Sequence, residues 1–216
     1  MATPTEENYL KALLALADPE GRTTISKLGE ALQVSTPSAN SMVRKLSERG
    51  LVDYQKYQPL RLTEAGRKAA ALVVRKHRLT EMFLVDVMGF GWEEVHTIAE
   101  QIEHVDSPDF FARMDKLMGH PRIDPHGSPI PDAEGSIDDL HHRRLDECLV
   151  GETATISGLD HSSNDFLHYL NGRDLSLRTE LTIEKKEAYD GSLTVSYPGH
   201  PREVLSKVVA SKLLVE

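Results

Sequence analysis

The hydrophobic pattern of this 216-residue chain changes its period at one proline- and glycine-rich segment, residues 121–136. Before this segment, apolar residues recur every three to four positions, for example over residues 6–17 and 68–87, which predicts helices. After it, short β-type runs separated by turn residues fill residues 150–216, with one short helix expected near 164–170. The pattern predicts a mainly α fold with β: helical domains first, then a small β-barrel.

The first 70 residues carry the signals of a winged helix-turn-helix. The predicted order is helix, short helix, turn, helix and β-hairpin. Ser35 is a good N-cap for the third helix, Pro37 lies in its first turn, and Gly50 is placed to end it. Two short strand-like runs follow on either side of Gln58-Pro59.

The two faces of the third predicted helix differ in chemistry. One arc of the helical wheel is apolar and is expected to pack inward, and the opposite arc is short, polar and basic, which suits the major groove of DNA. Lys56 and Arg61 of the hairpin are placed to contact phosphates. A three-helix bundle with a solvated basic face is the alternative interpretation. The outward arc carries Pro37, Ser41, Arg44 and Lys45.

Charge and cysteine content narrow the functional classes. The net charge is -9, but it is unevenly distributed. Residues 1–78 contain 13 Lys+Arg and 8 Asp+Glu, whereas the remaining residues contain 12 Lys+Arg and 26 Asp+Glu. A basic N-terminal module suits phosphate contact, and an acidic remainder suits cation binding or self-association. The single cysteine, Cys148, excludes an internal disulfide framework and a tetrahedral cysteine zinc site. Without an apolar stretch of ~18 residues or a signal-peptide pattern, we expect a cytoplasmic protein with no membrane partner.

Histidine and carboxylate residues recur at helical spacing between residues 77 and 104. His77 and Glu81 are four residues apart and share a helix face. Imidazole and carboxylate without thiolate suit Mn, Fe, Co, Ni or Zn, whereas the alternative is a solvated polar face. Asp124 and His126, two apart in the loop, form a second and weaker candidate pair. Four more residues of the same types fall within about 100° of arc on the next helix: His96, Glu100, Glu103 and His104.

With these residues in view, the chain resembles the diphtheria toxin repressor (DtxR) and manganese transport repressor (MntR) family. The resemblance rests on STPSANSMVRKL, KHRLTE, VHTIAEQIEHV and HPRIDPHGSPIP, and on the β-rich tail. It implies a homodimer that binds double-stranded operator DNA when metal-loaded and represses metal-uptake genes, with no catalysis and no small-molecule substrate. It also implies a winged helix-turn-helix domain (1–73), a helical metal-binding and dimerisation domain (74–140), a linker (141–149) and an SH3-like, FeoA-type domain (150–216).

The resemblance assigns two metal sites and a set of base-facing residues. Ser35, Pro37 and Ser41 match positions that face bases in the family. The primary site would use Asn8, His77, Glu100, Glu103 and His104. The ancillary site would use Glu81, His96, Asp124, His126 and Asp165.

One position indicates which metal is expected, and two others depart from the manganese-type pattern. Iron-type members resemble one another in having Cys where this chain has Glu100, and manganese-type members have an acidic residue there. Mn(II) is therefore expected, with Fe(II) as the alternative and other divalent transition metals binding in vitro. Asn8 stands where manganese-type members have Asp, and Lys11 where some have Glu. Outside this class of regulator, the alternatives are a metal-dependent hydrolase and a plain DNA-architectural or interaction module.

Overall fold

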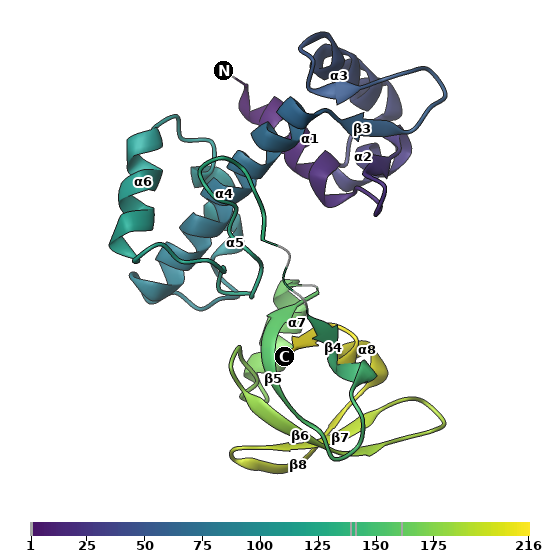
Figure 1. The fold of residues 1–216 in the computed structure, drawn as a ribbon, viewed down its shortest axis with the longest axis vertical. Coiled ribbons are helices and arrows are strands. Elements are labelled where there is room, and N and C mark those ends of the chain that lie inside the picture. The colour runs from purple at the N-terminus through teal and green to yellow at the C-terminus, as the bar shows by residue number, and fades with distance from the viewer. Residues whose placement is uncertain (1, 139, 141, 161) are drawn as a thin grey trace. The chain divides into compact units, whose positions relative to one another are not determined.

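The chain forms two compact units, which are described separately (Figure 1). The computed structural model describes residues 2–138, 140, 142–160 and 162–216. No helix within these ranges has both the length and the apolar character that crossing a membrane requires. The first unit consists of residues 1–80, 99–120 and 130–138, and the second of residues 81–98, 121–129 and 139–216.

The helix-turn-helix is built from α1 (Pro4–Ala15), α2 (Ile25–Ala31) and α3 (Thr36–Glu48). The Ser35 side chain accepts a hydrogen bond from the Ser38 backbone, so the predicted N-cap of α3 is confirmed. Gly50, just after α3, has a φ of 72°, the left-handed conformation that favours glycine at a helix end. These helices enclose a core that includes Leu10, Leu28 and Leu46.

The wing contains one strand more than predicted. Strand β3 (Leu60–Leu62) lies between β2 (Val52–Asp53) and β1 (Arg22–Thr23), and both neighbours are antiparallel to it. The β2–β3 hairpin is confirmed, whereas β1 was not predicted. A strand of two residues is too short to show a hydrophobic period, and only its pairing with β3 defines it.

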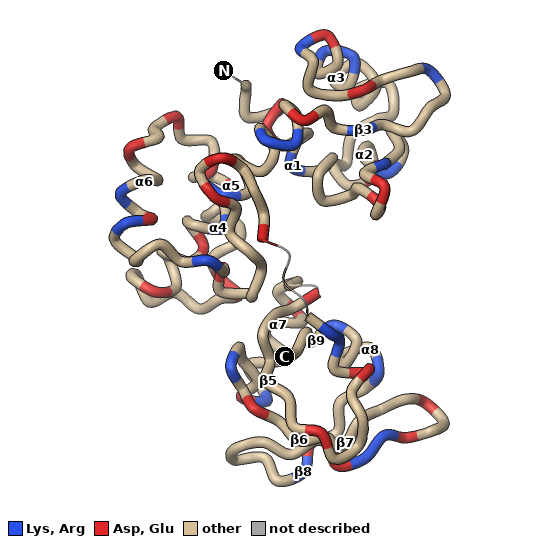
Figure 2. Tube along the Cα trace, viewed as in Figure 1, with Lys and Arg blue, Asp and Glu red and all other residues tan. Residues whose placement is uncertain are grey.

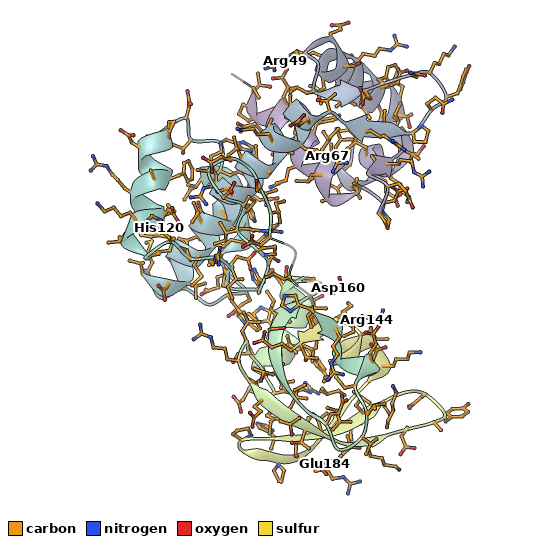
Figure 3. The ribbon with its side chains drawn as sticks, in the orientation of Figure 1. Arg49, Arg67, His120, Arg144, Asp160 and Glu184 are labelled. Carbon is orange, nitrogen blue, oxygen red and sulfur yellow. The ribbon has the colours of Figure 1, made fainter. Side chains whose placement is uncertain are left out.

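Glu6 ties the start of α1 to the end of α3. It is almost fully buried, with 1% of its surface exposed, and its carboxylate accepts from the Thr3 backbone N–H at 2.8 Å. Arg49 (labelled in Figure 3) donates to the same carboxylate at 2.6 Å, and Lys45 Nζ lies 3.2 Å away. The Thr3 hydrogen bond, together with Arg49 and Lys45, outweighs desolvation and lowers the pKa of Glu6 from 4.5 to about 2.

This depressed pKa predicts an acid-sensitive contribution to stability. The charged Glu6 stabilises the fold fully above its unfolded pKa of 4.5, and this stabilisation is lost as pH falls towards about 2. Glu6→Gln should therefore lower the free energy of unfolding by roughly 2–3 kcal/mol at pH 7 and by far less at pH 2.5. Urea unfolding of both proteins in chelator across this pH range measures the difference. A pH-independent difference would contradict the argument.

The helices that carry the candidate ligands follow the wing. The long helix α4 (Glu64–Asp86) matches the predicted 68–87 and passes through the domain limit expected at residue 73. The next predicted helix, 93–105, is shorter in the structure: α5 spans His96–Ile102. Glu103 and His104 therefore follow α5, although the Glu103 N–H still donates to the Ala99 carbonyl. The last helix of this group is α6 (Pro108–Leu117).

The C-terminal domain is a six-stranded antiparallel sheet that curls around its own core (Figure 1). The strand order is β4-β9-β5-β6-β7-β8, with register shifts in three pairings that allow the sheet to bend. The predicted short helix is α7 (Asn164–Asn171). The predicted terminal β-run, 206–216, instead begins with α8 (Lys207–Ala210). The strands are β4 (Arg143–Arg144), β5 (Thr153–Leu159), β6 (Glu180–Lys186), β7 (Leu193–Tyr197), β8 (His200–Leu205) and β9 (Leu213–Val215).

Within the segment expected as a linker, 141–149, the described residues 142–149 are part of this domain in the structure. The first residue of the segment, His141, lies outside the described residues. After it come β4 and a short 3-10 helix, η1 (Leu145–Glu147). Leu145 and Cys148 are fully buried in the C-terminal core, so hydrophobic burial fixes this segment to the domain.

The loop between α6 and β4 contains the same turn twice. In residues 124–128 (DPHGS) and 132–136 (DAEGS), the aspartate Oδ1 accepts backbone N–H groups two and four residues ahead. Gly127 and Gly135 have φ values of 86° and 85°. Gly127 lies against the β5 backbone at Ser157 and Gly158 in the second unit. Gly135 lies against the α4 backbone at Lys68 in the first.

Candidate metal centres and DNA-contacting face

The Glu103 carboxylate is the centre of the primary candidate site. It is fully buried, and its two oxygens meet different histidines: His77 Nδ1 lies 2.6 Å from Oε2, and His104 Nε2 lies 3.6 Å from Oε1. Lys11 Nζ lies 2.7 and 2.9 Å from the same two oxygens. Burial raises the pKa of Glu103, but the hydrogen bonds from His77 and Lys11 outweigh it and hold this pKa below its ordinary value.

Glu7, which the sequence argument missed, orients His104. Its carboxylate oxygen lies 2.6 Å from His104 Nδ1, on the opposite side of the ring from the nitrogen that faces Glu103. A carboxylate on the outer nitrogen of a histidine is the usual support of a metal-ligating imidazole, because it fixes the tautomer and the ring plane. The donor set and this support fit a divalent transition metal. The signal available in the sequence was only that Glu7 adjoins the candidate ligand Asn8.

The second candidate site is buried and lies wholly within the second unit. The ligand atoms of Glu81, Asp124 and His126 all lie within 4.8 Å of one another, and each residue is at most 4% exposed. His96 Nδ1 lies 3.2 Å from Oε1 of Glu81, although the His96 side chain is half exposed. The structure therefore brings together four of the five residues assigned to the ancillary site.

A hydrogen bond to the backbone turns the Nδ1 nitrogen of His126 towards the carboxylates. His126 Nε2 donates to the Trp92 carbonyl at 2.9 Å, and the His126 ring stacks on Trp92. Its Nδ1 consequently faces Glu81, at 3.7 Å, and Asp124, at 4.0 Å. Burial lowers the pKa of His126, but the Glu81 and Asp124 carboxylates outweigh it and raise this pKa. Two buried carboxylates facing one imidazole suit a cation, and a divalent metal would take the place of the proton.

Three assigned ligands lie at the edges of these clusters or away from them. Asn8 is exposed on α1, and Asp165 is exposed in the first turn of α7. Among the described residues, the groups of converging ligand atoms do not include Asp165. The Glu100 side chain is half exposed, with one oxygen 3.7 Å from Lys11 Nζ. The metal-binding roles of these three residues, like those of the other assigned ligands, stay predictions.

The outward face of α3 matches the helical-wheel prediction. Ala39, Val43 and Leu46 are fully buried, whereas the residues of the opposite arc are exposed, and Figure 2 shows basic positions on α3 and β3. Such a face is available to the major groove. The exposed residues are Ser35, Pro37, Ser41, Arg44 and Lys45.

The predicted phosphate-contacting residues differ in how they are held. The Arg44 guanidinium lies 6.0 Å from the centre of the Tyr54 ring, and Lys56 Nζ lies 4.8 Å from that of Tyr57. Lys45 is paired with Glu6, which the sequence argument did not foresee. Arg61 is exposed on β3, where it lines a cavity of about 340 Å³ with Arg22.

Family models match nearly the whole chain. Residues 1–60 match the model described as the iron dependent repressor N-terminal DNA binding domain. Residues 63–132 match the iron dependent repressor metal binding and dimerisation domain, and residues 143–216 match the FeoA domain.

Individual relatives extend over the same length. The iron-dependent repressor IdeR of Mycobacterium tuberculosis is 32% identical over 223 residues, covering 98% of this chain and 96% of the relative. The diphtheria toxin repressor of Corynebacterium diphtheriae is 29% identical, covering 93% and 92%. Among solved structures, a manganese-dependent transcriptional repressor in complex with manganese is 33% identical, with a TM-score of 0.88 and coverage of 98% and 99%.

Proposed function

The chain belongs to the diphtheria toxin repressor family of metal-dependent transcriptional repressors, and from this premise we propose that it is a manganese-responsive repressor acting in the cytoplasm. Its partners are operator DNA and a second copy of itself. A bound divalent ion supplies positive charge to the buried carboxylates and favours the DNA-binding state. Because such coupling is reciprocal, metal and operator each strengthen the binding of the other.

The environment of Glu103 is the observation that carries this proposal. Glu103 lies just after α5 and contacts Lys11, which belongs to α1. Its neighbour His104 contacts Glu7, which also belongs to α1. Charge placed at Glu103 is therefore linked directly to the first helix of the DNA-binding domain. Glu6, on the same helix, pairs with Lys45 and Arg49 at the C-terminal end of α3.

The chemistry of the donors supports Mn(II). The clusters offer carboxylate oxygens and imidazole nitrogens, and the only cysteine, Cys148, is buried in the C-terminal core. Carboxylate-rich sites suit Mn(II), whereas thiolate selects softer ions. Fe(II) shares most of these preferences, and the IdeR relative is named as iron-dependent. Fe(II) is therefore the competing ion in every test.

Self-association is supported by apolar side chains left exposed in the region that matches the dimerisation model. Val105 and Phe110 are each 43% exposed, and Leu117 is 67% exposed. Exposed apolar surface in a region of this kind is typical of protein interfaces. The metal-dependent hydrolase alternative is not supported, because the relatives are DNA-binding repressors.

Duplexes selected from a random-sequence pool with Mn(II)-loaded protein provide the test. The selected duplex is titrated in Mn(II), in Fe(II) under anaerobic conditions and in chelator, at one stated salt concentration. We expect Mn(II) to tighten binding by on the order of tenfold or more relative to chelator. Equal affinity in metal and in chelator would refute the proposal, and a stronger response to Fe(II) would assign iron.

Salt dependence tests the DNA-contacting face separately. If Arg44, Lys56 and Arg61 contact phosphates, each alanine variant should reduce the slope of log affinity against log salt by about 0.9. The loss should be similar on selected and unrelated duplexes, since phosphates carry no sequence information. Arg202→Ala, an exposed position on β8, is the control. An unchanged slope removes that residue from the proposed interface.

A further inference from the structure

We propose that the Lys11 ammonium is a built-in competitor of the metal ion at Glu103, neutralising this carboxylate in the metal-free protein and leaving it when a divalent cation binds. The inference rests on the proposed function, because it concerns regulation of the same site. In this role, Lys11 lowers the metal affinity of the site and so raises the metal concentration at which the site fills.

The position of the ammonium is the first support. Lys11 Nζ lies 2.7 Å from Oε1 and 2.9 Å from Oε2 of Glu103, so it sits in the fork of the carboxylate. Glu100 Oε1 lies 3.7 Å from the same nitrogen. A cation held through both carboxylate oxygens occupies this fork, and the ammonium is the cation that the described structure places there.

The histidines show why the two cations exclude each other. His77 and His104 approach the same two Glu103 oxygens, on Oε2 and Oε1 respectively. A metal held by these imidazoles and by Glu103 would compete with the Lys11 ammonium for the same two oxygens. An ammonium and a divalent ion in one carboxylate fork also repel each other strongly, because the site is buried.

The exposed fractions of the Lys11 and Glu103 side chains indicate which of the two moves when a metal binds. The Glu103 side chain is fully buried, whereas the Lys11 side chain is 22% exposed. A lysine has a long flexible stem and a compact charge that can turn outward into water. Lys11 therefore leaves and the carboxylate stays, and the free energy of the ion pair is subtracted from that of metal binding.

The alternative is that Lys11 is a fixed structural support present in both states. The two roles make opposite predictions. A competitor stabilises only the metal-free protein, so its removal tightens metal binding. A fixed support stabilises both states equally, so its removal leaves metal affinity unchanged.

The experiment compares Lys11→Leu, which removes the charge and offers no donor atom, with Lys11→Arg, which keeps the charge. Lys27→Leu makes the same charge change at an exposed position on α2. Mn(II) affinity of the full chain is measured from the electron paramagnetic resonance signal of free Mn(II). Thermal unfolding is recorded in chelator and in saturating Mn(II).

We expect Lys11→Leu to bind Mn(II) about tenfold more tightly than the wild type, which corresponds to about 1.4 kcal/mol. In chelator it should unfold at a lower temperature than Lys27→Leu, and in saturating Mn(II) this difference should disappear. Lys11→Arg should remain close to the wild type in affinity. If Lys11→Leu binds Mn(II) equally or more weakly, or loses stability equally in both conditions, the inference is wrong and the proposed function stands. If the wild type binds no divalent ion, both fail.

Discussion

Glu103→Gln is expected to abolish metal-gated operator binding while leaving the protein folded. The amide has almost the same size as the carboxylate but no charge, and it replaces one acceptor oxygen by a donor. Glu103 contacts His77, His104 and Lys11, so both primary-site histidines and the lysine meet at this one carboxylate. Mn(II) affinity should fall by on the order of 100-fold, the loss typical when a charged group of a binding site is removed.

The readouts are Mn(II) binding and operator affinity with and without the metal. For Glu103→Gln, the two operator affinities should agree within about twofold, so the coupling is lost. Glu180→Gln, at the exposed first residue of β6, is the matched control and should behave as the wild type. Circular dichroism establishes that the variant is folded. A folded Glu103→Gln protein with the normal metal response would remove Glu103 from the site.

Gly127→Ala is expected to be the most damaging of the glycine substitutions in the second unit and to impair the ancillary site. Gly127 has a φ of 86°, and a Cβ built there would lie 2.4 Å from both the Ser157 carbonyl oxygen and the Gly158 Cα. Atoms this close force the backbones apart. The turn that would move contains Asp124 and His126, and the His126 carbonyl accepts from the Leu159 N–H.

Gly151 provides a control with a similar positive φ but no collision. Its φ is 89°, and a Cβ there would meet nothing within 4 Å. Both alanine variants carry the cost of a positive φ, about 1 kcal/mol, whereas Gly127→Ala should cost roughly 2 kcal/mol more. Urea unfolding measures this difference, and metal analysis should find fewer bound ions per chain in Gly127→Ala only. Equal losses of stability would show that the packing of this turn on β5 is unimportant.

Local signals predicted the N-cap, the helical period and the exposed arc of α3 well. The Ser35 cap, the helical period of α3 and the position of Gly50 depend only on residues within one or two turns of each other. The burial of Ala39, Val43 and Leu46 follows from that period. The same reasoning was weaker in the C-terminal domain, where β8 was not predicted and α8 was expected as strand. Val208 and Val209 favour strands locally, but the Ser206 cap and packing against the core impose a helical turn.

For the candidate metal centres as well, local sequence signals and tertiary packing determined different features. Helical spacing and the resemblance named His77, Glu81, Glu103 and His104 as ligand types on shared faces. The amino-acid sequence by itself therefore determined the inventory of donors, because a helix places residues three or four apart on one side. Only the tertiary structure decided which of them meet. Lys11 and Glu103 are 92 residues apart, and Glu7 and His104 are 97 apart. Contacts of this range arise when helices pack, and no local period records them.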